Sequence, residues 1–304
     1  MKTLLALTVA ILALPVLAQP RASLQWGSSP SATLTQPGPL DRRNRTRYSA
    51  FAWSLGHQFR SPDLGSGSLQ LTYARRTVDL RGYSIDVQGP LPEAMYSLSA
   101  TSSWHRAWAG AYNSHVVLVP ALENASERTI GLSDVNLSAA LLLRRSEAQW
   151  SAGAGAAWTS AYGHPRLLPV LTLSVQSPSG RAAAGVIAPF WAGAHFAASP
   201  LVTVAFDARQ EGGEYRTDNE ETGEDEHVRY WSLTLGPRLA AALGQTDLQL
   251  SLRAGLEMRR RYDGVLSHDT VIRRELGNAR VLQLALQYGR APQLADAPLP
   301  ENWP

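Results

Sequence analysis

The sequence predicts an all-β protein, an antiparallel transmembrane β-barrel of about 12 strands, with a range of about 10 to 14. Three observations support this prediction. Segments in which apolar and polar residues alternate recur along most of the chain. Several run for about ten residues, whereas strands of soluble sheets usually have about five or six. A short apolar leader precedes all of them.

The leader is predicted to be a secretory signal peptide. Met1-Lys2-Thr3 gives a positive start, and the apolar run Leu4–Leu14 is shorter than the roughly 20 residues that a membrane-spanning helix needs. Val16 and Ala18 are compact residues at the two positions that a signal peptidase inspects. We therefore expect cleavage after Ala18 and export of the remaining chain.

The expected organisation is a signal peptide at 1–18, a flexible periplasmic N-terminal segment at 19–44, an outer-membrane β-barrel at 45–289 and a Pro-rich C-terminal tail at 290–304. Residues 19–44 are rich in Pro, Ser and Gly and show no sustained period, which is typical of poorly ordered chain ends. After the leader, no apolar run is long enough to predict a transmembrane helix.

The clearest predicted hairpin is Val228–Tyr262, with a turn at Gly244–Thr246. Successive side chains of a strand point to opposite sides. One face of its second strand is therefore apolar, and it carries Leu248, Leu250, Leu252, Ala254, Leu256 and Met258. The opposite face is ionic. Such a strand fits a barrel with lipid outside and water inside.

The first half of the chain repeats this alternation. Its apolar faces are Phe51, Trp53, Leu55 and Phe59, then Leu69, Leu71 and Tyr73, then Tyr96, Leu98, Ala100 and Trp104. Trp108–Ala121 is apolar on both faces near its end, so periodicity alone does not assign it. Arg81–Val87 is either a loop hairpin or an additional strand.

The second half continues the pattern. Its apolar faces are Val135 to Leu143, Trp150 to Trp158, Leu167 to Val175 and Leu282 to Tyr288, each at every second residue. Arg181–Trp191 and Leu201–Arg209 alternate more weakly and are separated by Ala192–Pro200. An alanine-rich helix is the alternative for 150–158, but its glycines and two-residue period favour a strand. Tryptophans at both ends of that strand fit aromatic belts at the two lipid–water boundaries.

Composition argues against several classes of function. The net charge is +3 and the basic residues are dispersed, which does not favour nucleic-acid binding. Lys2 is the only lysine, an arginine bias that we attribute to genome composition. The absence of cysteine rules out a disulfide framework, thiolate metal sites and cysteine nucleophiles. No cofactor is predicted.

Four residues are candidate lumen charges because they share the face opposite the leucines, namely Arg253, Glu257, Arg259 and Arg261. They would either fill a narrow interior with ion pairs or line a water path. Small barrels are filled by side chains and wide ones carry water, and a barrel of about twelve strands lies between these limits. Both alternatives stay open at this point.

Gln210–Arg229 is predicted to contain an acidic extracellular loop. Its carboxylates are Asp218, Glu220, Glu221, Glu224, Asp225 and Glu226. Oxygen ligands at this density suit a hard cation such as calcium, but their spacing does not match a helix-loop-helix calcium site. We therefore predict a solvated loop and no metal site. Sharing divalent ions with lipopolysaccharide phosphates is the alternative.

The seven histidines show no spacing that indicates a metal pair. Local groupings of the kind that a hydrolase uses are Ser103 with His105, Asn113 with His115, and His268 with Asp269. No nucleophile motif accompanies them. We therefore predict that the protein is not an enzyme, with a barrel hydrolase as a minor alternative.

The chain resembles a group of uncharacterised bacterial outer-membrane β-barrel proteins, defined as a domain of unknown function. The resemblance lies in Leu91–Tyr96, Leu132–Asp134, Gly163–Pro169, Ala188–Phe190, Gly212–Tyr215, Leu235–Arg238 and Gly255–Arg259. It covers most of the chain after the leader and implies an outer-membrane barrel without an established activity. Barrels commonly end on an aromatic residue, and here Tyr288 is followed by the Pro-rich tail.

The expected function is a narrow channel or passive transporter for small solutes in the bacterial outer membrane. The alternative is a structural or surface-interaction barrel without transport. The alternative fold is a soluble periplasmic β-sandwich. Expected partners are outer-membrane lipid, lipopolysaccharide and the outer-membrane assembly machinery, and the sequence carries no signal for an oligomeric state.

Overall fold

The structure is a computed structural model that describes residues 31–39, 47–61, 65–79, 94–108, 110–124, 134–159, 165–218, 225–243, 248–265, 271–276 and 278–288. The predicted signal peptide (1–18), the Pro-rich tail (290–304), the turn Gly244–Thr246 and the segment Arg81–Val87 lie outside these residues. No helix in the described ranges is long and apolar enough to cross a membrane.

The described chain forms one 15-stranded sheet, which confirms the all-β prediction. The strands are β1 (Ser31–Pro39), β2 (Arg47–Ser61), β3 (Gly65–Asp79), β4 (Ala94–Ala107), β5 (Tyr112–Asn124), β6 (Val135–Ser146), β7 (Trp150–Thr159), β8 (Arg166–Gln176), β9 (Ala182–Ala188), β10 (Trp191–Ala197), β11 (Val202–Asp218), β12 (Asp225–Ala242), β13 (Leu248–Val265), β14 (Val271–Leu276) and β15 (Ala279–Tyr288).

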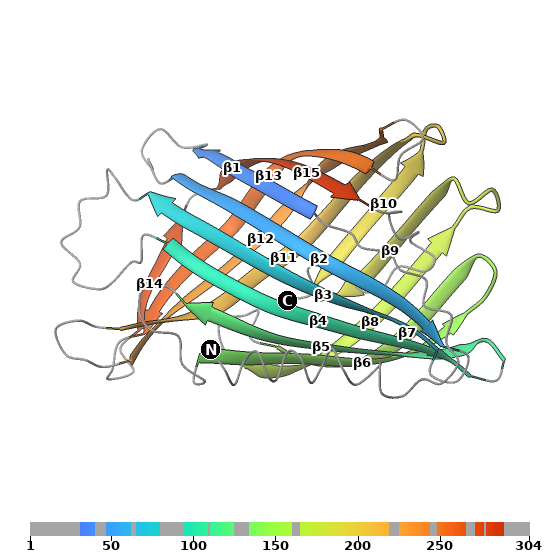
Figure 1. Ribbon diagram of the computed structural model, residues 1–304, viewed down its shortest axis with the longest axis horizontal. Helices are drawn as coiled ribbons and strands as arrows, with labels where there is room; N and C mark the ends of the chain where they lie inside the picture. The colour runs from blue at the N-terminus through green and yellow to red at the C-terminus, as the bar shows by residue number, and fades with distance from the viewer. Residues whose placement is uncertain are drawn as a thin grey trace.

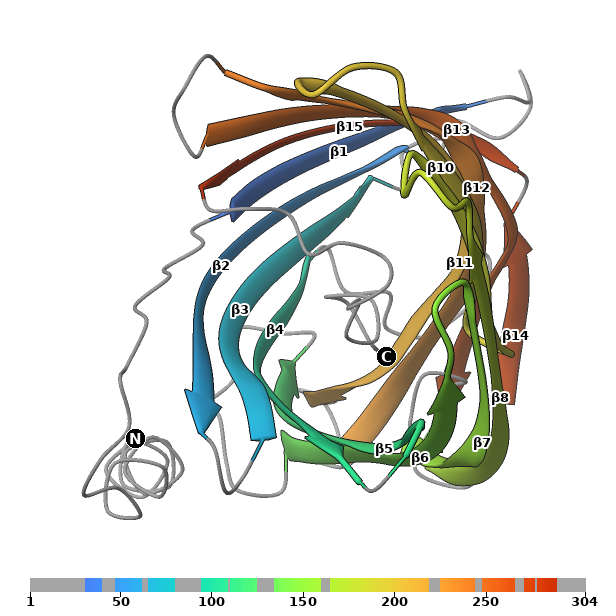
Figure 2. The same cartoon turned by 90° about the vertical axis from the view of Figure 1, so that its right-hand side faces the viewer.

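The sheet closes into a barrel (Figures 1 and 2). β1 to β13 pair in chain order, each strand antiparallel to the next, and β15 joins β13 back to β1. β14 pairs with the last residues of β13, beyond the part that pairs with β15. Because every strand except the short β14 has a partner on each side over much of its length, the main-chain hydrogen bonds are satisfied without a long open edge.

A second closure narrows one end of this barrel. β9 and β10 have 7 residues each, whereas β11 has 17 and continues beyond its last pair with β10, Trp191 with Arg209. The far end of β11 instead reaches β5, where Arg216 and Asn124 form a parallel bridge. β5 to β11 thereby close on themselves as a smaller ring within the larger sheet.

The two ends of the barrel differ in their connections. At one end, here called the short-turn end, the strands are joined by brief connections such as residues 62–64, 147–149 and 198–201. At the opposite end, consecutive strands are separated by more residues, for example 80–93 and 125–134. β1 begins and β15 ends at the short-turn end, because Ser31 pairs with Gln287.

The outer face of the barrel is apolar, as the alternation predicts. Exposed outward side chains include Leu137, Leu141, Leu143, Leu167, Leu171, Leu173, Leu282, Leu284 and Leu286. Trp150 and Trp158 are also exposed, at the two ends of β7. Their neighbours in the strands point to the interior and are buried, so the two-residue period separates an apolar outside from a largely polar inside.

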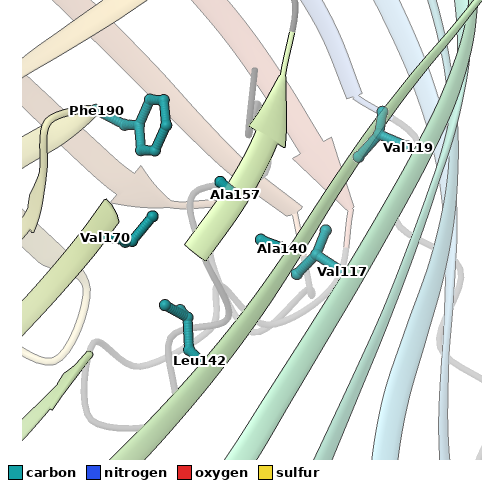
Figure 3. Close-up of a cluster of buried hydrophobic side chains, with 7 residues drawn as sticks. All are labelled: Val117, Val119, Ala140, Leu142, Ala157, Val170 and Phe190. Carbon is teal, nitrogen blue, oxygen red and sulfur yellow. The ribbon is translucent and has the colours of Figure 1, made fainter. Parts of the chain in front are cut away.

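One part of the interior is apolar. Buried side chains from β5 to β8 pack together with Phe190, which lies between β9 and β10 (Figure 3), and the cluster consists of Val117, Val119, Ala140, Leu142, Ala157, Val170 and Phe190. Small residues allow close strand contact here. A Cβ atom on Gly155 would lie 1.9 Å from the carbonyl oxygen of Leu141. This side of the barrel is therefore filled by side chains.

The sheet contains more strands than the predicted number of about 12. Residues 31–39, expected in the flexible segment 19–44, form β1 between β2 and β15. Ala192–Pro200, expected to separate two strands, supplies most of β10. β14 is a short addition beside β13. All three depend on neighbouring strands for their hydrogen bonds, so their own composition indicates them weakly.

Candidate functional site

The interior faces of β11, β12 and β13 carry a connected set of charged side chains. On β11, Val204 and Phe206 point outward and are exposed, so the alternating residues Asp207, Arg209 and Glu211 point inward. The β11–β12 and β12–β13 registers place them beside the inward residues of the next two strands. The sheet thus gathers ionisable groups on one side of the interior.

Arg253 and Asp207 form a buried ion pair within this set. The Arg253 guanidinium donates to the Asp207 carboxylate and, at 3.3 Å, to the Asp207 backbone oxygen. Arg253 lies on β13 and Asp207 on β11, so the pair reaches across β12. Removing either partner would leave a charge in a poorly solvated position, which costs more than the pair itself contributes.

Glu257 is the most deeply buried charge of the network, with 0% of its surface exposed. Its carboxylate accepts a hydrogen bond from the Tyr230 hydroxyl and lies 3.4 Å from the Arg260 Nε. The guanidinium of Arg76 stacks 5.1 Å from the centre of the Tyr230 ring. Tyr230 therefore contacts a carboxylate through its hydroxyl and a guanidinium through the face of its ring.

Arg76 connects opposite walls of the barrel. It lies on β3, which does not neighbour β11 in the sheet, and its Nη2 donates to Glu211 Oε2 at 3.0 Å. The Nε of Arg209 lies 2.7 Å from the other oxygen of Glu211. Arg209 also donates to Gln283 on β15 at 3.1 Å. These contacts span the interior instead of following one strand pair.

A β-bulge decides which predicted lumen charges face the interior. Trp231 pairs with Arg261 but Leu233 pairs with Met258, so β13 carries one extra residue, and Arg259 there has a φ of 51°. Arg253 and Glu257 precede the bulge and point inward. Arg260 follows it and is buried beside Glu257. Arg259 is exposed at the bulge itself.

Arg261 lies on the other face of β13, contrary to the alternation extrapolated from the leucines. Its Nε donates to Asp263 at 2.8 Å. The extra residue in the strand reverses the two faces beyond it, since side chains alternate with a strict period of two. Arg260, which the sequence placed with the leucines, takes the interior position.

More of the acidic segment lies in strands than expected. Asp218 pairs with Asp225, and Thr217 with Glu226, in the β11–β12 ladder. Glu220, Glu221 and Glu224 lie outside the described residues. In the ranges that the structure describes, no three His, Asp or Glu side chains are grouped so that they could hold a metal ion.

A second polar cluster joins β5, β6 and β11 where the smaller ring closes. The Asn136 side-chain amide donates to Glu123 Oε2 at 2.7 Å and to the Glu214 backbone oxygen at 3.0 Å. The Glu214 carboxylate accepts from Arg229 Nε at 3.1 Å. The Asn136–Glu214 contact ties the part of β11 beyond β10 to β6, and together with the Arg216–Asn124 bridge to β5 it defines the narrow end.

The hydrolase-like groupings meet on the interior faces of β4 and β5. His105 and His115 are cross-strand partners whose rings lie edge to face at 6.4 Å. Ser103 bonds the hydroxyl of Ser68 at 2.7 Å. Among the described side chains, no hydrogen bond joins either imidazole to a serine hydroxyl. His268 and Asp269 lie outside the described residues.

Much of the network was not identified from the sequence. Arg76, Asp207, Arg209, Glu211 and Tyr230 are absent from the predicted lumen charges. A signal existed for three of them, because Asp207, Arg209 and Glu211 alternate opposite Val204 and Phe206. Arg76 is 135 residues from Glu211, a separation over which local alternation carries no information.

Two solved structures show what the chain is similar to in shape. Outer membrane phospholipase A from Escherichia coli is 10% identical, with 88% of this chain and 99% of that chain covered and a TM-score of 0.33. The beta domain of the Bordetella autotransporter Brka is 13% identical, with 87% and 100% covered and a TM-score of 0.29. Both scores are too low to support an argument about this chain.

No curated protein matches the sequence. A family described as a domain of unknown function, DUF6268, matches residues 92–265. The matched range runs from just before β4 to the end of β13 and includes β11 and β12, so it contains most of the interior network. It also spans more than half of the chain, and the protein therefore belongs to the DUF6268 family.

Proposed function

We propose that this protein is an outer-membrane β-barrel that conducts small polar solutes through a narrow, ion-paired interior. The predicted signal peptide would direct export. The exposed leucines of the outer face would contact lipid, because an apolar surface of this extent is unstable in water. Short separations between consecutive strands at one end and longer ones at the other match the periplasmic and extracellular ends of such barrels.

The observation that carries the channel proposal is that the interior charges are partly wetted. The side chains of Arg76 and Glu211 are 20% and 24% exposed although they face inward and pair with each other. Arg238 on β12 is exposed as well. Interior charges that touch solvent indicate water-accessible space within the barrel, which a fully packed interior would not leave.

The same network limits the width of that space. Glu257, Tyr230, Arg253 and Arg260 are buried around it, and Arg76 bridges to Glu211 from the opposite wall. Ions and small polar molecules would therefore pass beside a constriction that is held by ion pairs. The expected conductance is low, and breaking the Arg76 bridge should raise it.

Conductance across planar bilayers tests the proposal. The informative variant is Arg76→Ala, which removes the side chain that spans the interior. The matched control is Arg75→Ala, because Arg75 is the adjacent residue, lies on the opposite face and stacks over Tyr96. We expect a larger unitary current for Arg76→Ala and an unchanged one for Arg75→Ala. Folded protein that carries no current, with or without Arg76, would refute the channel.

The second candidate is a structural or surface-interaction barrel without transport. It is favoured by the apolar cluster that fills the β5–β8 side and by the complete burial of Glu257. Under this alternative the network would serve only to hold the barrel closed. Absence of current from Arg76→Ala, together with normal heat-dependent gel mobility of the folded protein, would favour it over the channel.

Gel mobility also separates both barrel proposals from a soluble sandwich. A membrane barrel resists detergent and migrates differently before and after boiling, because its closed hydrogen-bonded sheet unfolds only on heating. One mobility under both conditions, with the protein soluble in the absence of detergent, would exclude a membrane barrel.

A further inference from the structure

Two arginines face each other on the interior surface near the short-turn end. Arg238 of β12 and Arg253 of β13 are direct cross-strand partners. Like charges in this arrangement repel each other and destabilise a sheet unless a counter-charge lies nearby. Asp207 supplies that counter-charge to Arg253, through the buried ion pair described above.

Arg238 has no such partner. It is exposed to the interior space, and within the described ranges no carboxylate forms an ion pair with it. Its cross-strand partner on β11 is Ala205, and the partner of Ala205 on β10 is His195, so these residues form one row across the strands. Among the described residues, the row that contains Arg238 therefore holds a cation without a paired carboxylate, which leaves it available to a mobile anion.

A second interior arginine without a paired carboxylate among the described side chains lies near the same end. Arg144 lies on the inward face of β6, close to the turn that leads to β7, and its guanidinium donates to the Ser151 hydroxyl. No carboxylate pairs with it among the described side chains. Its cross-strand partner on β5 is Asn113, and the next interior residue along β5 is His115.

Among the described side chains, the first charged groups met from the short-turn end are consequently mostly arginines. On β6 this group is Arg144, on β12 it is Arg238 and on β13 it is Arg253. On β11 it is Asp207, which is already paired. A positive potential in a narrow space raises the local concentration of anions and lowers that of cations.

We propose that the interior of this barrel selects small anions, such as chloride, phosphate or a small carboxylate, and that Arg238 and Arg144 attract them. This inference rests on the proposed channel and adds a substrate class to it. Arg253 contributes less, because Asp207 compensates its charge. The selected anion enters or leaves at the short-turn end and passes the constriction around Arg76 and Glu211.

Reversal potentials across a potassium chloride gradient test the inference. We expect the wild type to pass chloride in preference to potassium. Arg238→Gln and Arg144→Gln should each lower the chloride-to-potassium permeability ratio by about two- to fivefold, the effect of removing one partly screened charge a few ångströms from the path. The matched control is Arg280→Gln, because Arg280 is exposed on the outward face of β15.

The outcomes separate the inference from the channel itself. A conducting wild type that passes both ions equally, or prefers potassium, overturns anion selection and keeps the channel. If no variant conducts, the channel is refuted. The line width of the ³⁵Cl NMR signal, measured with the detergent-folded barrel, then tests whether the interior binds chloride. Broadening that Arg238→Gln reduces supports anion binding, whereas equal line widths for wild type and Arg238→Gln overturn it.

Discussion

Replacement of Glu257 by glutamine should destabilise the barrel more than any surface change of the same kind. Glu257 is fully buried, accepts the Tyr230 hydroxyl and pairs with the buried Arg260. Glutamine keeps the size and one acceptor oxygen but removes the charge that compensates the Arg260 guanidinium. Breaking one partner of a buried ion pair costs about 3–5 kcal/mol, because the remaining charge is poorly solvated.

The matched control is Glu147→Gln. Glu147 pairs with Arg145 at 2.7 Å, but the two side chains are 38% and 53% exposed and lie at a turn. Solvent screens this pair, so its removal should change the free energy of unfolding little. The two substitutions alter the same functional group, and burial is the main difference between them.

Urea titration of the protein folded into phospholipid vesicles, followed by tryptophan fluorescence, measures both effects. The double variant Glu257→Gln/Arg260→Gln should recover part of the loss, because it removes both buried charges together. The reasoning would be refuted if Glu257→Gln and Glu147→Gln lowered the free energy of unfolding equally. It would also be refuted if the double variant lost more free energy of unfolding than the two single variants lose together.

Three further substitutions test other parts of the structure. Gly155→Ala places a Cβ 1.9 Å from the Leu141 carbonyl oxygen and should cost about 1–3 kcal/mol of stability, whereas Gly264→Ala meets open space and should fold normally on a heat-modifiability gel. Asn136→Ala removes the bond to the Glu214 backbone oxygen on β11 and the bond to Glu123 on β5, and it should cost about 1–3 kcal/mol in the same urea titration; an unchanged midpoint would contradict a stabilising role of these bonds. Leu171→Arg puts a charge on an outward position that is 61% exposed and should cost about 2–4 kcal/mol in lipid, and no loss would argue against lipid contact there.

Alternation along single strands was enough to predict the barrel. Alternate leucines of β6, β8 and β13 are outward and exposed, as a period of two requires, among them Leu141, Leu143, Leu171, Leu173, Leu250 and Leu252. Arg253 and Glu257 follow from the same rule, because they stand at odd positions opposite those leucines. A local rule succeeds where one face of a strand contacts one kind of environment throughout.

The rule fails where the backbone departs from regular pairing. Three consecutive arginines, Arg259 to Arg261, carry no sequence signal for the bulge that turns Arg260 inward and Arg261 outward. A positive φ is usually adopted by glycine, as in the G1 class of bulge, and here an arginine has it. The register with β12 decides the outcome, and that register depends on contacts beyond the strand itself.

Contacts between distant strands also escape a reading of the sequence. β1 has the composition of a linker and becomes a strand because β2 and β15 supply partners on both sides. Arg76 reaches Glu211 only after the whole sheet has closed. The narrow end likewise depends on the shortness of β9 and β10, whose effect on β11 appears only in three dimensions.

The direct test of a membrane barrel with an apolar outside and an ionic inside is spin labelling along β8. The chain has no cysteine, so single cysteines at successive positions from Leu167 to Val175 carry one label each without a prior substitution. In lipid vesicles, labels at Leu171 and Leu173 should be accessible to oxygen dissolved in the bilayer, and labels at Thr172 and Ser174 should not. Equal accessibility at neighbouring positions, or contact of Leu171 with a water-soluble relaxant, would contradict the barrel.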